Sequence, residues 1–229
     1  MTAENTQAIL ISLQVGFWVV LLGFPIALFM GWLLARRQFF GSTAIGTLVL
    51  VPMVLPPVVT GLLILDLLGR NTTLGGICAK YAFPLSFSFQ AAVLAALVVG
   101  LPLYIWAARS AFEAVDRRYE ELSLSMGVPP WQTFFRVTLP LASPGLAAGM
   151  VLAFARGLGE FGATAVLAGN KEGETRTIAL AVYTLLESPH GEEATYPLVL
   201  ASLGLSIFAL VGYERLLRWQ RHRLELDNG

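Results

Sequence analysis

The stretch YEELSLSMGVPPWQTFFRVTLP, Tyr119–Pro140, organises the interpretation of the whole sequence. It is polar, whereas the runs before and after it are each long and apolar enough to cross a bilayer. Gly127 can adopt a φ that other residues avoid, and Pro129 and Pro130 cannot continue the preceding helix. The pattern therefore predicts a helix, a sharp turn and a second helix, a short element that projects from a membrane. We call residues 119–140 the knuckle.

Composition indicates a polytopic membrane protein. Of the 229 residues, 56% are hydrophobic and only 13% are charged, and the mean hydropathy is +0.69. A soluble domain of this size could not bury so much apolar surface. The net charge of zero gives no reason to expect a nucleic-acid partner. Cys78 is the only cysteine, which excludes an internal disulfide and a cysteine-based metal cluster.

The apolar segments predict one all-α membrane domain that occupies residues 1–229. The expected spans lie at about 8–35, 44–68, 89–108, 141–168 and 196–217, and the loop 109–140 joins the third span to the fourth. The N-terminal MTAENTQ carries no basic residue, so we expect no cleaved signal peptide and a retained first span. Residues 178–186 are apolar but too short to cross, and we expect them at the outer surface.

The second apolar segment contains three prolines, Pro52, Pro56 and Pro57. Proline removes backbone donors and forces a break or a kink, and lipid cannot satisfy the freed carbonyls. The broken helix is therefore expected to face the interior of the bundle. Pro56, Pro57 and the nearby Thr60 are candidates for the wall of a passage, although a kink that serves packing alone accounts for the pattern equally well.

Basic residues predict the orientation of the chain. Ten fall on one side, against four on the other (Arg70, Lys80, Lys171 and Arg176), and Arg156 lies within a span. The excess of basic residues on the cytoplasmic side places the knuckle and the C-terminus in the cytoplasm and the N-terminus outside. The ten are Arg36, Arg37, Arg109, Arg117, Arg118, Arg136, Arg215, Arg218, Arg221 and Arg223.

The knuckle resembles the EAA motif of bacterial ABC importer permeases, EAA-x3-G-x9-I-x-LP. Glu121, Leu122 and Ser123 stand at EAA, Gly127 follows six residues after the glutamate, and the segment 137–140, VTLP, ends the motif. Leu122 and Ser123 replace the two alanines and a valine replaces the isoleucine, but the spacing is kept throughout. An ordinary loop with a Gly-Pro turn is the simpler alternative.

The resemblance implies that the knuckle is a coupling helix that docks in a groove on a cytoplasmic ATPase. Met126 and Trp131 would form an exposed apolar knob, and Gly127 would let another backbone come close. The residues expected to couple to the ATPase are Glu121, Leu122, Ser123, Met126, Gly127, Trp131, Leu139 and Pro140. The implied partners are a second copy of the chain, two ATPase subunits and a periplasmic binding protein.

A second constellation, FARGLGEFGATAVLAGNKEGETRT, covers residues 154–177. Arg156 and Glu160 are four residues apart and can form an ion pair on one helix face. Such a pair either neutralises itself and fixes helix packing, or lends weak positive potential to an anion route. Together with Pro56, Pro57 and Thr60, the path candidates are Arg156, Glu160 and Thr164.

This constellation resembles the permeases for tetrahedral oxyanions, the molybdate/tungstate and sulfate/thiosulfate importers, which carry A-R-x-L/I-G-E-F/Y-G here. LPPVVTGLLIL at 55–65, GETRTI at 173–178 and YTL at 183–185 favour molybdate. The resemblance implies the permease subunit of an ATP-driven molybdate importer in the bacterial inner membrane, which works by alternating access. A sulfate/thiosulfate permease is the alternative within this class.

No enzyme site is expected in this chain. His190 and His222 are its only histidines, so neither a histidine-rich metal site nor a Ser-His-Asp arrangement is available. A GxxxxGK[ST] loop is also absent, so ATP and Mg²⁺ would bind to the partner ATPase and this chain would hold no cofactor. An ion-gradient carrier or an integral membrane enzyme would need a titratable cluster within the spans, for which Arg156, Glu160 and Asp66 are the only candidates.

Overall fold

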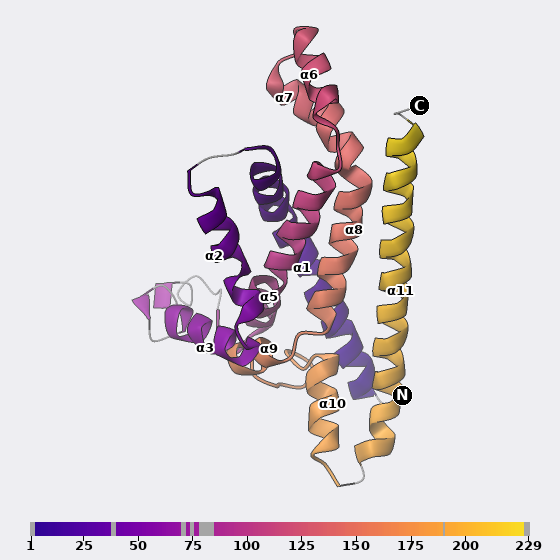
Figure 1. Ribbon diagram of the computed structural model, residues 1–229. Coiled ribbons are helices and arrows are strands. Elements are labelled where there is room, and N and C mark those ends of the chain that lie inside the picture. The colour runs from indigo at the N-terminus through magenta and orange to yellow at the C-terminus, as the bar shows by residue number, and fades with distance from the viewer. Residues whose placement is uncertain are drawn as a thin grey trace.

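The computed structural model describes residues 3–37, 40–69, 72–73, 76–77, 85–189 and 191–226, and in these ranges every regular element is helical. Four long helices run along one common axis (Figure 1). They are α1 (Ala3–Arg36), α5 (Phe89–Glu113), α8 (Leu139–Leu158) and α11 (Gly191–Leu226). The predicted all-α class is confirmed.

Shorter helices connect the long ones or lie beside them. Between α1 and α5 lie α2 (Ser42–Val54) and α3 (Pro57–Leu68). The knuckle contains most of α6 (Arg117–Ser125), together with α7 (Pro130–Thr133) and the π-helical turn η1 (Phe134–Thr138). After α8 come α9 (Gly162–Leu167) and α10 (Ile178–Leu186).

Four continuous helical stretches in the described residues are long and apolar enough to cross a membrane: 3–36, 89–113, 130–158 and 193–219. A fifth span is present if α2 and α3 are counted together, although the two are bent by 109° at the break between them. The break falls at Leu55 and Pro56, where the proline run predicts it. The chain is therefore a polytopic membrane protein with four or five spans.

The fourth apolar segment differs from the continuous helix expected over 141–168. Helix α8 ends at Leu158, and a non-helical step precedes the short helix α9. The buried carboxylate of Glu160 lies in this step and accepts a hydrogen bond from the amide of Ala163 in the first turn of α9. A side-chain acceptor at this place favours the start of a new helix over continuation of the old one.

Helices α1, α5 and α8 form the centre of the bundle, and α11 packs on α8 (Figure 1). One apolar cluster joins α1, α5 and α9, and a second joins α1, α5 and α8 toward the knuckle. Alanine is the commonest residue at the buried positions of α5, and small residues let helix backbones approach closely where lipid provides no hydrophobic driving force.

The two ends of the bundle carry different elements. The knuckle and the C-terminal end of α11 lie at one end, and the N-terminus and α10 lie at the other (Figure 1). Helix α11 exposes a long row of large apolar side chains, which suits contact with lipid. The assignment of the knuckle end to the cytoplasm remains a prediction from the basic residues.

Candidate functional site

The knuckle is a tight helical hairpin whose turn depends on Gly127. Helix α6 begins after Asp116, whose side chain accepts a hydrogen bond from the amide of Arg118, and it ends at Ser125. Gly127 then adopts φ +80°, and α7 starts at Pro130. A positive φ at this position is the conformation that the sequence predicts. A Cβ placed on Gly127 would meet no atom of the chain within 4 Å, so the glycine is needed for its backbone and not for internal space.

The tip of the knuckle presents apolar side chains to its surroundings. Met126 is 81% exposed and Trp131 is 64% exposed, and Leu122 is exposed beside them. Glu121 is also exposed, on the same short helix. An apolar group on a polar, rigid protrusion is typical of a surface that binds another protein.

Other residues of the motif serve the knuckle itself. The Ser123 hydroxyl lies 2.9 Å from that of Thr133, which ties α6 to α7. Leu139 is partly buried against the second apolar cluster, and Pro140 is exposed in the first turn of α8. The predicted coupling residues thus fall into two groups: some form the exposed tip of the knuckle, and others hold its helices together or join it to α8.

The base of the knuckle is fixed to α1 by a charge pair that the sequence did not indicate. Arg36 Nε lies 3.0 Å from Glu120 Oε1, and the Arg36 side chain is only 7% exposed. The hydroxyl of Thr138 in η1 donates to the same Glu120 oxygen at 2.8 Å. Arg36 also donates to the carbonyl of Val115 at 2.9 Å, just before α6. One arginine at the end of α1 therefore contacts the first arm of the knuckle directly and is linked to the second arm through Glu120 and Thr138.

Aromatic rings pack beneath this charge pair. Phe134 contacts Trp32 of α1 edge to face, with ring centroids 5.8 Å apart, and lies 6.1 Å from the ring of Phe112 of α5. Aromatic contacts of this kind add to the stability that burial already supplies. The knuckle is thus a rigid extension of α1 and α5 as well as of α8.

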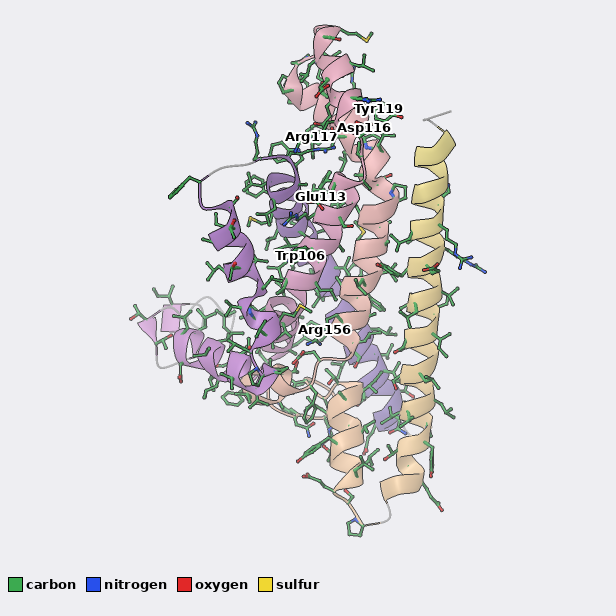
Figure 2. All side chains as sticks on the ribbon, in the orientation of Figure 1. Trp106, Glu113, Asp116, Arg117, Tyr119 and Arg156 are labelled. Carbon is green, nitrogen blue, oxygen red and sulfur yellow. The ribbon has the colours of Figure 1, made fainter. Side chains whose placement is uncertain are left out.

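The Arg156–Glu160 ion pair is present, as the spacing predicts. Arg156 Nη1 lies 2.9 Å from Glu160 Oε2, although Glu160 lies beyond the end of α8. Glu160 is 2% exposed, and its other oxygen accepts from the amide of Ala163 at 3.0 Å. The buried carboxylate therefore has one partner on each oxygen, which offsets much of the cost of burying its charge. Figure 2 shows Arg156 far from the knuckle along the bundle.

Helix α3 lies against α9, directly beside this pair. A Cβ on Gly61 would come within 2.8 Å of the Cα of Ala163, so the two backbones are in contact. Thr60 and Thr164 are both buried in these helices, and neither hydroxyl has a hydrogen-bond partner in the described part of the chain. Pro57 lies at the same contact, near Gly162.

The path candidates are thus split by the structure. Glu160 and Thr164 lie at or in α9, and Thr60 lies in the helix that packs on it, whereas Arg156 reaches the group from α8. Pro56 is exposed at the start of α3. The role of these side chains in an anion path stays a prediction.

The loop at the opposite end of the bundle is held together by polar contacts. The amide of Lys171 donates to the Thr175 hydroxyl at 2.9 Å, and the side chain of Arg176 contacts those of Asn170 and Glu172. A hydrogen bond to the side chain of Glu187 raises the pKa of Tyr183 on α10 above its usual value. The loop is an ordered surface beside the N-terminus.

Residues 23–222 match the family described as the binding-protein-dependent transport system inner membrane component. The chain belongs to this family. It is 42% identical to the molybdenum transport system permease protein ModB of Escherichia coli (strain K12) over 224 residues, which covers 97% of this chain and 98% of the relative. The chain is therefore a permease of the bacterial inner membrane.

Solved structures of importer permeases have the same fold. The methionine ABC transporter MetNI, in inward-facing conformations, matches with a TM-score of 0.74 and 18% identity over 96% of this permease and 99% of that chain. A bacterial alginate ABC transporter, solved with an alginate pentasaccharide-bound periplasmic protein, matches with a TM-score of 0.69 and 18% identity over 98% of the permease and 81% of that chain. At these identities the likeness concerns the fold alone.

Replacement of Glu120 should loosen the knuckle of the permease. Glu120→Ala leaves the nearly buried Arg36 guanidinium without its carboxylate and should lower the free energy of unfolding by about 2 kcal/mol. Thermal unfolding in detergent measures the loss. Glu121→Ala is the matched control, because Glu121 is exposed and has no ion pair among the described residues. Equal midpoints for the two variants would contradict the anchoring role of Glu120.

Glu160 should be far more sensitive than a surface glutamate. Glu160→Ala removes the acceptor for the α9 amide and leaves Arg156 unpaired, with an expected loss of about 3 kcal/mol. Glu160→Gln keeps a carbonyl acceptor and should lose less. Glu172→Gln, which breaks the outer pair with Arg176, should cost less than about 1 kcal/mol. Denaturant unfolding of the wild type and the three variants measures the order of their stabilities. A Glu160→Ala protein as stable as Glu172→Gln would refute the structural role of Glu160.

Proposed function

We propose that this permease is the membrane subunit of an ATP-driven importer that carries molybdate across the inner membrane. The observation that carries the proposal is the 42% identity to ModB, a molybdenum transport permease, over almost the entire length of both chains. The Arg156–Glu160 pair and the α3–α9 contact lie in the segments whose sequence favours a tetrahedral oxyanion. Sulfate, which has the same charge and shape as molybdate, is the competing cargo.

ATP hydrolysis would take place on a separate polypeptide. The exposed tip of the knuckle, with Met126 and Trp131, would dock in a groove of a cytoplasmic ATPase. The complete transporter would contain two permeases and two ATPase subunits, because one knuckle would dock on one nucleotide-binding subunit. The tight Gly127 turn and the Arg36–Glu120 pair make the knuckle stiff enough to transmit a displacement.

The transport cycle would be one of alternating access. A molybdate-loaded periplasmic binding protein docks at the end that carries α10 and the ordered loop, and ATP binding draws the knuckles together and opens the route toward it. The anion then enters a weakly binding passage, and it leaves to the cytoplasm after hydrolysis. A weak site suits transport, because a dianion held tightly inside would not be released. Arg156 fits such a site, since Glu160 neutralises most of its charge.

Transport by the reconstituted complex tests the cargo and the energy source together. Proteoliposomes that contain the permease, its ATPase and the binding protein should accumulate labelled molybdate only with ATP. A tenfold excess of tungstate should abolish most of the uptake, whereas the same excess of sulfate should compete poorly. Strong competition by sulfate would instead assign the chain to sulfate/thiosulfate import, and accumulation by the permease alone would refute the ATP-driven mechanism.

Substitutions at Gly127 test the coupling role. Gly127→Lys adds a bulky charge at a positive φ on the docking surface and should abolish uptake while membrane insertion stays normal. Gly127→Asn, which tolerates a positive φ, should retain part of the uptake. Both variants leave the interior of the permease unchanged, because a Cβ at Gly127 meets no neighbouring atom. Normal uptake by Gly127→Lys would rule out docking through this turn.

A further inference from the structure

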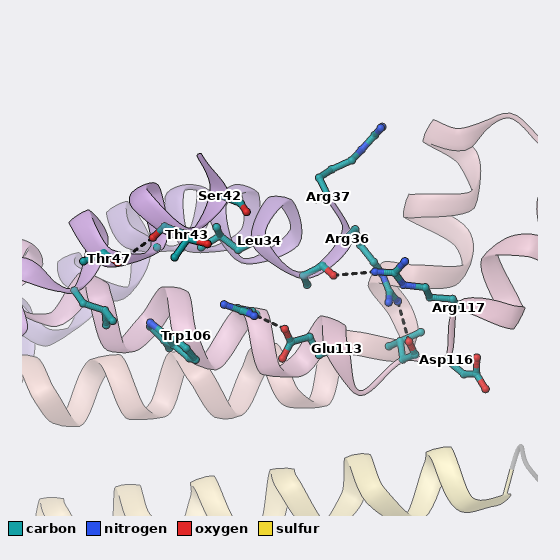
Figure 3. A pocket seen from close by; sticks show the side chains of 15 residues that line it. Leu34, Arg36, Arg37, Ser42, Thr43, Thr47, Trp106, Glu113, Asp116 and Arg117 are labelled. Atoms are coloured by element: carbon teal, nitrogen blue, oxygen red, sulfur yellow. Dashed lines mark hydrogen bonds and ion pairs between the residues drawn. The ribbon is translucent and has the colours of Figure 1, made fainter. Parts of the chain in front are cut away.

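A cleft of about 780 Å³ lies at the knuckle end of the bundle, apart from the Arg156–Glu160 segment. The end of α1, the first turns of α2 and the end of α5 form its walls (Figure 3). The volume is within the range of ligand-binding pockets and exceeds what one small ion fills. Four arginines and two acidic residues line it, namely Arg36, Arg37, Arg109, Arg117, Glu113 and Asp116.

Two of these arginines already have carboxylate partners. Arg36 pairs with Glu120 of the knuckle, and Arg109 Nε lies 2.7 Å from Glu113 Oε1. Arg37 and Arg117 form no ion pair with any acidic residue in the described ranges. Within the described residues, the side chain of Arg117 donates a long hydrogen bond, 3.4 Å, to the carbonyl of Ala35. Among the described residues, the cleft keeps a small excess of positive charge after Glu113, Asp116 and Glu120 are counted.

The wall formed by α2 adds uncharged donors. Its N-cap residue is Gly41, which has no side chain to cap the amides of the first turn. The amides at the start of a helix carry partial positive charge and bind anions. Ser42 and Thr43 bring hydroxyl groups to the same wall of the cleft. The lining of the cleft thus combines guanidinium groups with a helix N-terminus and hydroxyls, all of which favour an anion.

We propose that this cleft binds a tetrahedral oxyanion weakly, with Arg117 as its main charged contact. This inference rests on the proposed function and deepens it: the free anion would stop here after it leaves the passage and before its release from the knuckle end. The shared Arg36, which lines the cleft and holds Glu120, places the bound anion next to the coupling element. The phosphate of an anionic lipid has the same chemistry, and the experiment separates the two sources.

Cysteine protection measures occupancy of the cleft in the assembled transporter. Cys78→Ser removes the native thiol, and Gly46→Cys places a new one in the cleft, where an added Cβ meets no atom within 4 Å. Nanodiscs of phosphatidylcholine hold the complex, and a neutral maleimide labels the thiol. Molybdate or sulfate at millimolar concentration should slow the labelling, and chloride at equal ionic strength should not.

Arg117→Gln and Arg118→Gln form a matched pair of variants. The two residues are adjacent at the start of α6, but only Arg117 lines the cleft. Arg117→Gln should raise the half-protecting concentration about fivefold, whereas Arg118→Gln should leave it unchanged. Protection that is absent, or equally affected by both substitutions, would overturn the proposal. A complex with Cys78→Ser and Gly46→Cys that transports molybdate but shows no protection refutes the cleft site alone, whereas the absence of molybdate transport by the wild-type complex refutes the proposed function.

Nanodiscs that contain phosphatidylglycerol distinguish the two sources of the oxyanion. Slow labelling without added anion in these discs, but not in phosphatidylcholine, would identify a lipid phosphate as the occupant. That result would refute the cleft as a site for the free anion before its release. Protection by added molybdate in both kinds of disc would support the free anion.

Discussion

The charge pair between Arg36 and Glu120 is the contact on which the rest of the arrangement depends. Arg36 is nearly buried, and it reaches the carboxylate of Glu120 and the carbonyl of Val115 at once. Thr138 donates to the same carboxylate from the other arm of the knuckle. Because an unpaired guanidinium at this place would be costly, the three segments are fixed relative to one another. A force applied at Trp131 therefore moves α1 and α8 together and does not merely bend a loop.

At the other end of α8, a single carboxylate again joins two segments of the chain. Glu160 accepts from Arg156 with one oxygen and from the first turn of α9 with the other. Helix α9 in turn supports α3 through a backbone contact at Gly61. A displacement of α8 at the knuckle can thus reach the break between α2 and α3, which is the place where the chain is bent most sharply. The buried hydroxyls of Thr60 and Thr164 lie in these two helices, where a small shift of α3 against α9 could give them partners.

Local features of this fold could be predicted from the sequence, and long-range ones could not. Hydropathy indicates the long helices, Pro56 and Pro57 indicate the break, and Gly127 indicates the turn, because each depends on a few neighbouring residues. The Arg156–Glu160 pair was accessible for the same reason, since four residues separate its members. Glu120 was missed because its partner Arg36 lies on another helix and the motif draws attention to Glu121. The early end of α8 was missed because Glu160 was read as a helical residue and not as the acceptor that starts α9.

The distribution of charge argues for a passage that attracts an anion at its knuckle end and is nearly neutral within. Arg156, the basic residue inside the spans, is neutralised by Glu160 at 2.9 Å. At the knuckle end, by contrast, Arg37 and Arg117 have no acidic partner in the described residues. In the proposed cycle, an anion that has crossed the neutral passage would be drawn by this excess charge toward the knuckle, and the exposure of both arginines to water would keep the attraction weak. Arg36 borders the same cleft and contacts Glu120 of the knuckle, so departure of the anion and the position of the knuckle would act on one side chain. This shared residue would be the physical route by which release and nucleotide turnover influence each other.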